Sequence, residues 1–210
     1  MIKRREFLTL GAAALIASPL TGPLLADAAH AQQVDVEAIL NDPEAPVGGN
    51  PKGDVTIVAY QDYNCIYCKK STPDLARIVK EDGKIRLVYK DWPILSETSV
   101  VAAQLAIATK FQGAYEKAHT ALMGITARQA DQDAILKALQ DAGIDMKRLQ
   151  ADLDAHGPKI SALLQRNLAQ ADSLGLSGTP TYLVGPFRTG TLDYAGFKQV
   201  VADARARQAE

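Results

Sequence analysis

Apolar and polar positions predict a strand, a helix and a second strand in the first half of the chain. An apolar, β-branched run from Val55 to Tyr60 has the length and composition of a buried strand. Beyond it, side chains recur on one face at helical spacing: Thr72, Leu75, Ile78 and Val79. Gly83 ends that helix, and residues 84–89 predict the second strand. This order predicts parallel strands joined by a right-handed crossover.

The periodicity is helical throughout from Glu97 to Leu174, which predicts an all-helical insertion between two parts of a sheet. Pro158 is expected to open the last of these helices, and Gly175 to follow its end. Residues 181–189 then predict a β-hairpin, and residues 193–207 predict a closing helix.

The first 31 residues have the pattern of an export signal. Lys3, Arg4 and Arg5 begin it, an apolar run from Leu8 to Leu25 follows, and Ala29-His30-Ala31 matches a cleavage site. The paired arginines also resemble the twin-arginine export motif, with an ordinary secretory signal or an uncleaved membrane anchor as alternatives. We therefore expect a periplasmic protein.

The predicted mature chain has two parts. Residues 32–53 form an N-terminal extension, with a short helix at 36–40 and a turn-rich segment at 41–51 that packs against an edge. Residues 54–208 form the main domain, with the helical insertion at about 97–174. No repeat occurs in the sequence, and no apolar run after residue 31 is long enough to span a bilayer.

Charge argues against two classes of partner. The whole chain has 23 basic and 24 acidic residues, which become 20 and 22 when the three basic and two acidic residues of the signal are left out. A mature charge near −2 without a basic run does not favour nucleic acid or an anionic membrane surface.

The only two cysteines, Cys65 and Cys68, fall where the first predicted strand turns into the helix. Free backbone N–H groups and the helix dipole favour a thiolate over a thiol there. Positions three apart on a helical turn are about 5–6 Å apart, within reach of a disulfide. The favoured interpretation is a redox-active pair, with Cys65 as the exposed nucleophile and Cys68, on the buried stripe, as the resolving thiol.

Three other interpretations of the cysteine pair stay open. A structural disulfide around two residues would remove little chain entropy, because the stabilisation grows with loop length. Zinc needs four ligands, yet the sequence has one Cys-x-x-Cys and three scattered histidines, so no metal and no cofactor are expected. The pair could also be two buried, inert thiols.

Together these features resemble the DsbA-like branch of the thioredoxin-fold superfamily over about residues 34–205. Cys-x-x-Cys alone is a weak signal, but its combination with the other features is specific. The resemblance implies an α/β, thioredoxin-like fold with an inserted all-helical subdomain. Five features carry it: Asp62 to Cys68, Pro73 eight residues after Cys65, the strand exit Lys90 to Leu95, the helical insertion, and Ser177 to Thr181.

The resemblance also implies roles outside the cysteine pair. In this family the bond before the proline equivalent to Pro180 is cis, and Thr179 would offer its backbone N–H and C=O to an extended substrate strand. Ala59 stands where the family often has a buried glutamate, and Asp62 is either its substitute or a solvated turn residue. Ile66-Tyr67 replaces the Pro-His of strongly oxidising members, so we expect a less oxidising disulfide.

The expected activity is thiol–disulfide exchange, in the oxidising direction, with unfolded or reduced exported proteins as substrates. A membrane or periplasmic redox partner would restore the disulfide. A disulfide isomerase or reductase is the alternative; such members usually oligomerise through a long N-terminal extension, and only about 20 residues precede the first strand. A peptide-binding chaperone with incidental thiols is a further one. His119 and Trp92 are expected to be core residues.

Overall fold

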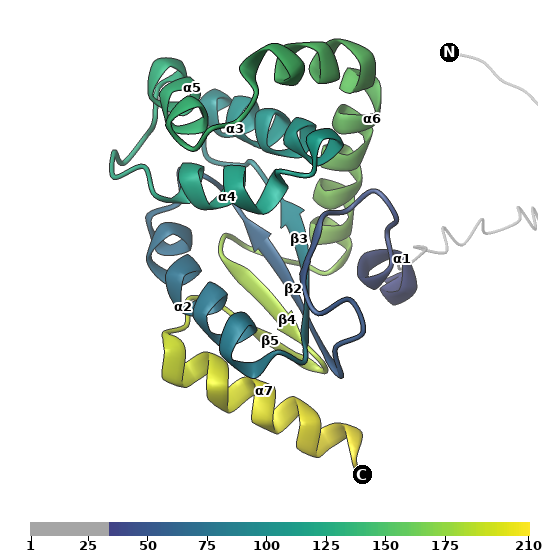
Figure 1. The fold of residues 1–210 in the computed structure, drawn as a ribbon. Coiled ribbons are helices and arrows are strands. Elements are labelled where there is room, and N and C mark those ends of the chain that lie inside the picture. The colour runs from purple at the N-terminus through teal and green to yellow at the C-terminus, as the bar shows by residue number, and fades with distance from the viewer. Residues whose placement is uncertain (1–33) are drawn as a thin grey trace, which may run out of the picture. The chain divides into compact units, whose positions relative to one another are not determined.

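The computed structural model describes residues 34–210, so the predicted export signal at 1–31 lies outside the described residues. Figure 1 shows the elements, which are, in chain order, α1 Val36–Leu40, β1 Val47–Gly49, β2 Val55–Gln61, α2 Ile66–Asp82, β3 Ile85–Asp91, α3 Glu97–Ala108, the 3-10 turn η1 Thr109–Gln112, α4 Tyr115–Met123, α5 Gln132–Asp141, α6 Met146–Ser173, β4 Thr181–Val184, β5 Phe187–Thr189 and α7 Tyr194–Gln208.

Strand β2 lies inside a five-stranded mixed sheet with the order β1-β3-β2-β4-β5. It pairs in parallel with β3, from Val55 opposite Ile85 to Gln61 opposite Asp91. The other neighbouring strands pair antiparallel. The predicted strand–helix–strand unit is confirmed, and each strand runs one or two residues further than the pattern predicted.

The two faces of the sheet bury separate cores. Ile57 and Ala59 of β2 belong to the larger core, which includes apolar residues of α2, α7 and the inserted helices. Val58, Tyr60 and Trp92 pack on the opposite face with residues of α1 and α6. This is the period-two alternation of a sheet covered on both sides. Helix α2 begins five residues after the last residue of β2, so its first turn lies at the carboxyl end of that strand.

Helices α3 to α6 follow β3 and precede β4, and α3, α4 and α5 lie beyond the carboxyl ends of β2 and β3 (Figure 1). The expected α/β fold with an inserted helical subdomain is confirmed. The helices therefore flank the end of the sheet at which the cysteine pair lies.

The expectation that Pro158 opens a helix is wrong. Helix α6 begins after Asp145, whose carboxylate caps the backbone N–H of Arg148, and it continues through Pro158 to Ser173. A proline inside a helix removes one backbone hydrogen bond. Leu149 before the proline and Ile160 after it are both buried in the same core, which holds the two halves of α6 in one helix. Gly175 follows the end of α6, as predicted.

The turn-rich segment before β2 contains a short strand that the pattern did not predict. Strand β1 pairs antiparallel with the edge of β3, with Val47 opposite Val88. Two of its three residues are glycine, which is depleted in strands. Gly49 has a φ of 65°, and a Cβ on it would collide with the carbonyl of Ile85. Glycine at this position makes the strand hard to predict from the sequence, but it is needed for the close approach of β1 to β3.

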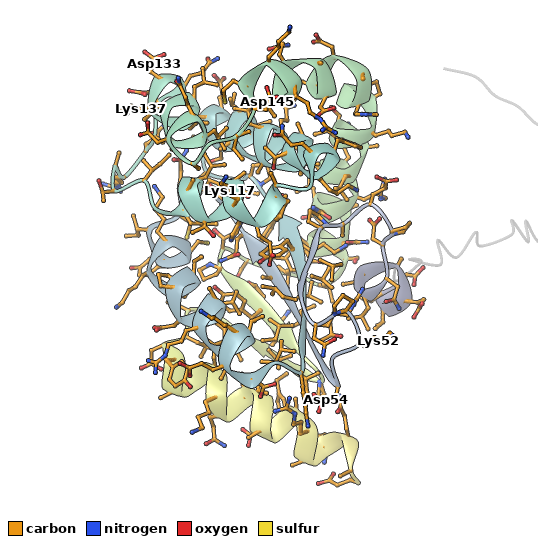
Figure 2. The ribbon with its side chains drawn as sticks, in the orientation of Figure 1. Lys52, Asp54, Lys117, Asp133, Lys137 and Asp145 are labelled. Carbon is orange, nitrogen blue, oxygen red and sulfur yellow. The ribbon has the colours of Figure 1, made fainter. Side chains whose placement is uncertain are left out.

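Charged side chains lie on the outer surface of the inserted helices, as Lys117 of α4 and Asp133 and Lys137 of α5 illustrate in Figure 2. No helix among residues 34–210 is long and apolar enough to cross a membrane.

Candidate active site

Asp62 organises the loop between β2 and α2. Its Oδ1 accepts the backbone N–H of Asn64 and the hydroxyl of Ser99, both at 2.7 Å. Its Oδ2 accepts the backbone N–H groups of Ile94 at 2.8 Å and Leu95 at 3.0 Å. The side chain is buried, so Asp62 is not a solvated turn residue. Four donors occupy its oxygens, and the carboxylate ties the cysteine loop to the segment after β3.

Cys65 is the N-cap of α2. Its Sγ accepts the backbone N–H of Cys68 at 3.3 Å, and its S–H donates to the carbonyl oxygen of Thr179 at 3.1 Å. The thiol of Cys68 and the helix N–H groups stabilise the thiolate and lower the pKa of Cys65 to about 6, although burial opposes this shift. Both cysteines are free thiols in this structure.

The exposure predicted for Cys65 is wrong, because the residue is only 5 % exposed. The loop at Thr179 lies against its sulfur and covers it. Sequence periodicity places the residue on the helix but carries no information about a loop more than 100 residues away. Cys65 still lines a cavity, so a small group can approach it from there.

Cys68 faces the core one turn into α2, and it is 0 % exposed. Burial raises the pKa of its thiol. Neutral polar groups surround this turn: Thr72 donates to the Cys68 carbonyl at 2.8 Å, and Gln61 donates to Thr72 and to the hydroxyl of Tyr182. Ala59, where the family often has a glutamate, is also buried and supplies no carboxyl group.

The peptide bond between Thr179 and Pro180 is cis, as the resemblance implied. The hydroxyl of Thr181 donates to the carbonyl of Gly178 at 2.7 Å. The loop therefore has an internal hydrogen bond beside β4, and its Thr179 carbonyl faces the sulfur of Cys65.

A cavity of about 690 Å³ opens beside Cys65. Four of the side chains around it are large, apolar and 42 % to 57 % exposed, namely Ile66, Tyr67, Ile94 and Leu95. Exposed apolar groups at one place mark a surface that binds another molecule. The cavity is also lined by Arg128, Gln129 and residues 177–179.

A buried acid that the sequence reasoning missed lies at the end of β3. Asp91 is 3 % exposed and accepts the hydroxyl of Tyr115 at 2.9 Å. Burial raises its pKa to about 7. Tyr63, in the cysteine loop, lies 3.1 Å from Nδ1 of His119 and 3.5 Å from the Tyr115 hydroxyl. Strand alternation could have found Asp91, because it shares the inward face of Leu87 and Tyr89.

The histidines of the described region are structural, as expected for His119. It is 4 % exposed, and burial lowers its pKa to about 4. His156 stacks on Phe111 with ring centroids 3.8 Å apart. Among residues 34–210, no three His, Cys, Asp or Glu side chains are grouped as a metal site requires.

A Cys-x-x-Cys turn at the start of a helix, with a cis-proline loop against its first sulfur, defines a redox protein of the thioredoxin fold. The comparisons agree with this class. A family model described as thioredoxin matches residues 41–203. The chain therefore belongs to the thioredoxin family, and its fold and Cys-x-x-Cys site are those of the DsbA-like thiol–disulfide oxidoreductases.

Several solved structures resemble the chain. A thioredoxin-like oxidoreductase from Silicibacter pomeroyi is 39 % identical with a TM-score of 0.76, over 82 % of this chain and 98 % of that one. The catalytic domain of Proteus mirabilis ScsC is 26 % identical with a TM-score of 0.73, over 81 % and 94 %. The thiol-disulfide exchange protein α-DsbA2 from Wolbachia pipientis is 26 % identical with a TM-score of 0.74, over 80 % and 90 %.

Curated relatives contain a similar stretch within a longer protein. The Na⁺/H⁺ antiporter NhaA 3 of Salinispora tropica is 27 % identical over 170 residues, which is 77 % of this chain and 25 % of the antiporter. The chain thus spans about a quarter of the length of the curated relative it matches.

Proposed function

We propose that this protein oxidises cysteine-containing proteins by thiol–disulfide exchange. Cys65 is the sulfur that a substrate thiolate attacks and, in the reverse direction, the nucleophile, with Cys68 as its resolving thiol. The observation that carries the proposal is the Cys65 sulfur at the N-cap of α2, 3.3 Å from the backbone N of Cys68. A lowered pKa for Cys65 beside a raised pKa for Cys68 separates the two roles. The first thiol ionises readily, and the second stays protonated until a mixed disulfide needs it.

The reaction moves two electrons from the substrate to the enzyme. Of the two protons that the substrate thiols lose, one goes to Cys68 and the other to solvent. A substrate thiolate attacks Sγ of Cys65 in the Cys65–Cys68 disulfide, and Cys68 leaves and takes up a proton. A second substrate thiolate attacks the substrate sulfur of the mixed disulfide, and Cys65 leaves as a thiolate. The substrate then has a disulfide, and the reduced enzyme has a Cys65 thiolate and a Cys68 thiol. A partner disulfide, membrane-bound or periplasmic, accepts the two electrons and restores the enzyme.

The loop at Thr179 and Pro180 would bind the substrate backbone. In the reduced structure the Thr179 carbonyl accepts the S–H of Cys65 at 3.1 Å. Loss of that proton, or formation of a mixed disulfide, frees the carbonyl for a backbone N–H of an extended substrate strand. Backbone recognition does not require a particular sequence, which suits an enzyme that acts on many unfolded proteins.

Thiolate stability supports the oxidising direction. Whatever stabilises the Cys65 thiolate stabilises the reduced enzyme, and a stable reduced form makes the disulfide a stronger oxidant. We also propose that the chain is exported to the periplasm through the signal at 1–31. A relative from Salmonella enterica serovar Typhimurium, 29 % identical, is described as a periplasmic thioredoxin-like protein, which supports this location.

The test combines a reaction in solution with the thiol state in cells. Oxidised protein is mixed with a reduced two-cysteine peptide, and peptide disulfide is measured by mass spectrometry after an acid quench. We expect peptide oxidation and, in acid-quenched periplasmic extracts, a mostly oxidised cysteine pair. A mostly reduced pair would overturn the direction in favour of an isomerase or reductase. Failure to oxidise the peptide, with chaperone activity intact in a Cys65→Ser variant, would overturn the enzyme proposal.

A further inference from the structure

The loop between α4 and α5 forms one wall of the cavity beside Cys65, and residues flanking the two cysteines hold it there. Nζ of Lys69, directly after Cys68, donates to the carbonyl of Ala127 at 2.8 Å. The side-chain oxygen of Asn64, directly before Cys65, accepts the backbone N–H of Ala130 at 2.9 Å. Only two residues lie between these anchors, so the wall at 128–129 is fixed relative to the cysteine turn.

Of the residues 34–210 that line the cavity, one of these two is the only lysine, arginine, aspartate or glutamate. Arg128 is exposed, and no ion pair of residues 34–210 involves it. A guanidinium has five donors in a rigid fork that matches a carboxylate. Among the described residues Arg128 is therefore a cation without an ion-pair partner, and it lines the same cavity as Cys65.

A second cavity, of about 400 Å³, continues the same surface. It shares Ser177 and Gly178 with the first cavity and is also lined by Pro180. In the described part of the chain, its only charged lining residue is again an arginine, Arg188, whose Nη1 donates to the Leu174 carbonyl at 2.9 Å. A substrate strand that follows the Thr179 loop would pass over both cavities.

Neither cavity is lined by an aspartate or a glutamate among the described residues. The chain as a whole has slightly more acidic than basic residues. The Asp62 carboxylate of the cysteine loop is buried and lines neither cavity, and Asp133 of α5 lies on the outer surface of the inserted helices (Figure 2). The surface around Cys65 is thus locally cationic on a weakly anionic protein, so it is complementary to an acidic peptide.

We infer that Arg128 selects substrates with an aspartate or glutamate next to the reactive cysteine. The inference rests on the proposed function and deepens it, because it names the substrate class of the same site. The apolar rim and the Thr179 loop accept any unfolded strand, whereas Arg128 adds a preference between strands through an ion pair with the flanking carboxylate.

The experiment measures one coupling between protein and peptide. Two peptides each contain two cysteines on a flexible spacer; aspartate flanks the cysteines in one and asparagine in the other. Each is oxidised in a single turnover by pre-oxidised wild type, Arg128→Gln and Arg207→Gln, the last removing the same charge at the exposed end of α7. For each protein, the rate with the aspartate peptide is divided by the rate with the asparagine peptide. The coupling is this ratio for the wild type divided by the same ratio for Arg128→Gln. This division cancels any effect of aspartate on the peptide's own thiols.

A partly exposed ion pair predicts a coupling of roughly two- to fivefold in favour of the aspartate peptide. Arg207→Gln should keep the wild-type ratio. The coupling should shrink in 1 M salt, where the Debye length falls to about 3 Å. The inference is refuted by a coupling of one at low salt, or by an equal loss in Arg207→Gln.

Oxidation of dithiothreitol, a dithiol without charge, by the wild type distinguishes a failure of the proposed function from a failure of the role of Arg128. A protein that is reduced by dithiothreitol and oxidises both peptides with a coupling of one keeps the proposed function and refutes the role of Arg128. A protein that oxidises neither dithiothreitol nor peptide refutes the proposed function and the inference together.

Discussion

Cys65 lies at the N-cap of α2, whereas Cys68 lies one turn further along the same helix with its side chain towards the sheet. Both are largely buried, at 5 % and 0 % exposure. The sulfur of Cys65 nevertheless accepts a helix N–H and borders a cavity. Cys68 instead faces the apolar core of β2 and β4. The pKa of Cys65 is lowered to about 6, and the pKa of Cys68 is raised.

The difference shows that burial alone does not decide how a thiol behaves. Burial disfavours the thiolate at both positions, but hydrogen bonds from the Cys68 thiol and from the helix N–H groups outweigh it only at Cys65. Two cysteines one helical turn apart therefore differ in charge: Cys65 ionises to a thiolate, and Cys68 stays a neutral thiol. The following predictions, in order of decreasing effect, test this difference in pKa.

The largest expected effect comes from replacing each cysteine in turn. Cys65→Ser removes the attacked sulfur, so oxidation of a two-cysteine peptide should fall by several orders of magnitude. Cys68→Ser leaves a reactive Cys65 but no resolving thiol, so on incubation with the disulfide form of the peptide Cys65 attacks one sulfur, the other leaves as a thiolate, and a mixed disulfide should accumulate on a non-reducing gel. Ser71→Ala, one turn further along α2, is the matched control and should form no such adduct. Equal adducts from both cysteine variants would contradict the assigned roles.

Much of the fold could be predicted from the sequence, because its signals are local. The run from Val55 to Tyr60 and the hairpin at 181–189 have strand composition, and a glycine marks the end of α2. Strand β1 and the continuity of α6 through Pro158 could not be predicted. In both cases packing against distant residues overrides the local preference of glycine or proline.

The site divides in the same way. The cysteine turn and Thr179-Pro180 could be predicted to lie together because both are short motifs, and Cys65 does contact the Thr179 carbonyl. The burial of two neighbouring charged residues, Lys90 and Asp91, could not be predicted in this way. Lys90 is 0 % exposed, and its Nζ lies 3.9 Å from a carboxylate oxygen of Asp42. Asp91 lies on the other face of the sheet, where its carboxyl group accepts the hydroxyl of Tyr115. Period-two alternation sends adjacent residues to opposite faces, but only the tertiary structure supplies a counter-ion to one and not to the other.

The stability of the reduced protein should depend on pH through Cys65. Its folded pKa of about 6 lies below the value of about 8.5 for an unfolded cysteine. The unfolded state therefore binds more protons, and stability rises with pH, by about 1.5 kcal/mol between pH 6 and pH 7.5. The contribution is lost as the pH falls through 6. Urea unfolding of reduced wild type at both pH values measures it.

The control for this measurement is Cys65→Ser, because another group titrates in the same range. Burial raises the pKa of Asp91 to about 7, which acts with the opposite sign and makes stability fall as the pH rises towards 7. Subtracting the variant's stability cancels Asp91 and leaves Cys65. A difference that does not change between pH 6 and pH 7.5 would mean that Cys65 is an ordinary thiol.

Alkylation of Cys65 by iodoacetamide should reach half of its maximum rate near pH 6. At pH 6 about half of Cys65 is thiolate, against well under 1 % of a free thiol with a pKa of about 8.5. A less basic thiolate is also less nucleophilic, with a Brønsted slope of about 0.4–0.5. The two effects together predict a rate about tenfold above that of a free thiol at pH 6 and about threefold below it at pH 8.

Burial of Cys65 lowers the alkylation rate by the same factor at every pH. The decisive result is therefore the shape of the plot of rate against pH. A rate that keeps rising through pH 8.5 would contradict the lowered pKa. The profile is measured on reduced wild type, which keeps the Cys68 thiol beside Cys65, and peptide mapping identifies the alkylated sulfur. Urea-unfolded Cys68→Ser, with its single cysteine, supplies the reference thiol.

The smallest expected effect comes from the dipeptide between the cysteines. Ile66 and Tyr67 supply no cation to the thiolate, and both are at least half exposed. A Cys65 pKa of about 6 lies between about 7 in thioredoxin and about 3.5 in DsbA. We therefore expect a reduction potential between about −270 and −120 mV, the values of those two proteins. Tyr67→His should raise the potential at pH 6, where the imidazole is largely protonated and stabilises the thiolate.

The shift should be below about 30 mV, which is a tenfold change in the equilibrium with glutathione, because solvent screens a charge on an exposed side chain. Tyr67→Gln removes the same ring without adding a cation. If both variants shift the potential equally in a glutathione titration, the effect comes from the lost ring. If only the histidine variant shifts the potential, and the shift disappears at pH 8, a positive charge at position 67 stabilises the Cys65 thiolate. Charge on this dipeptide then adds to the difference in pKa between Cys65 and Cys68.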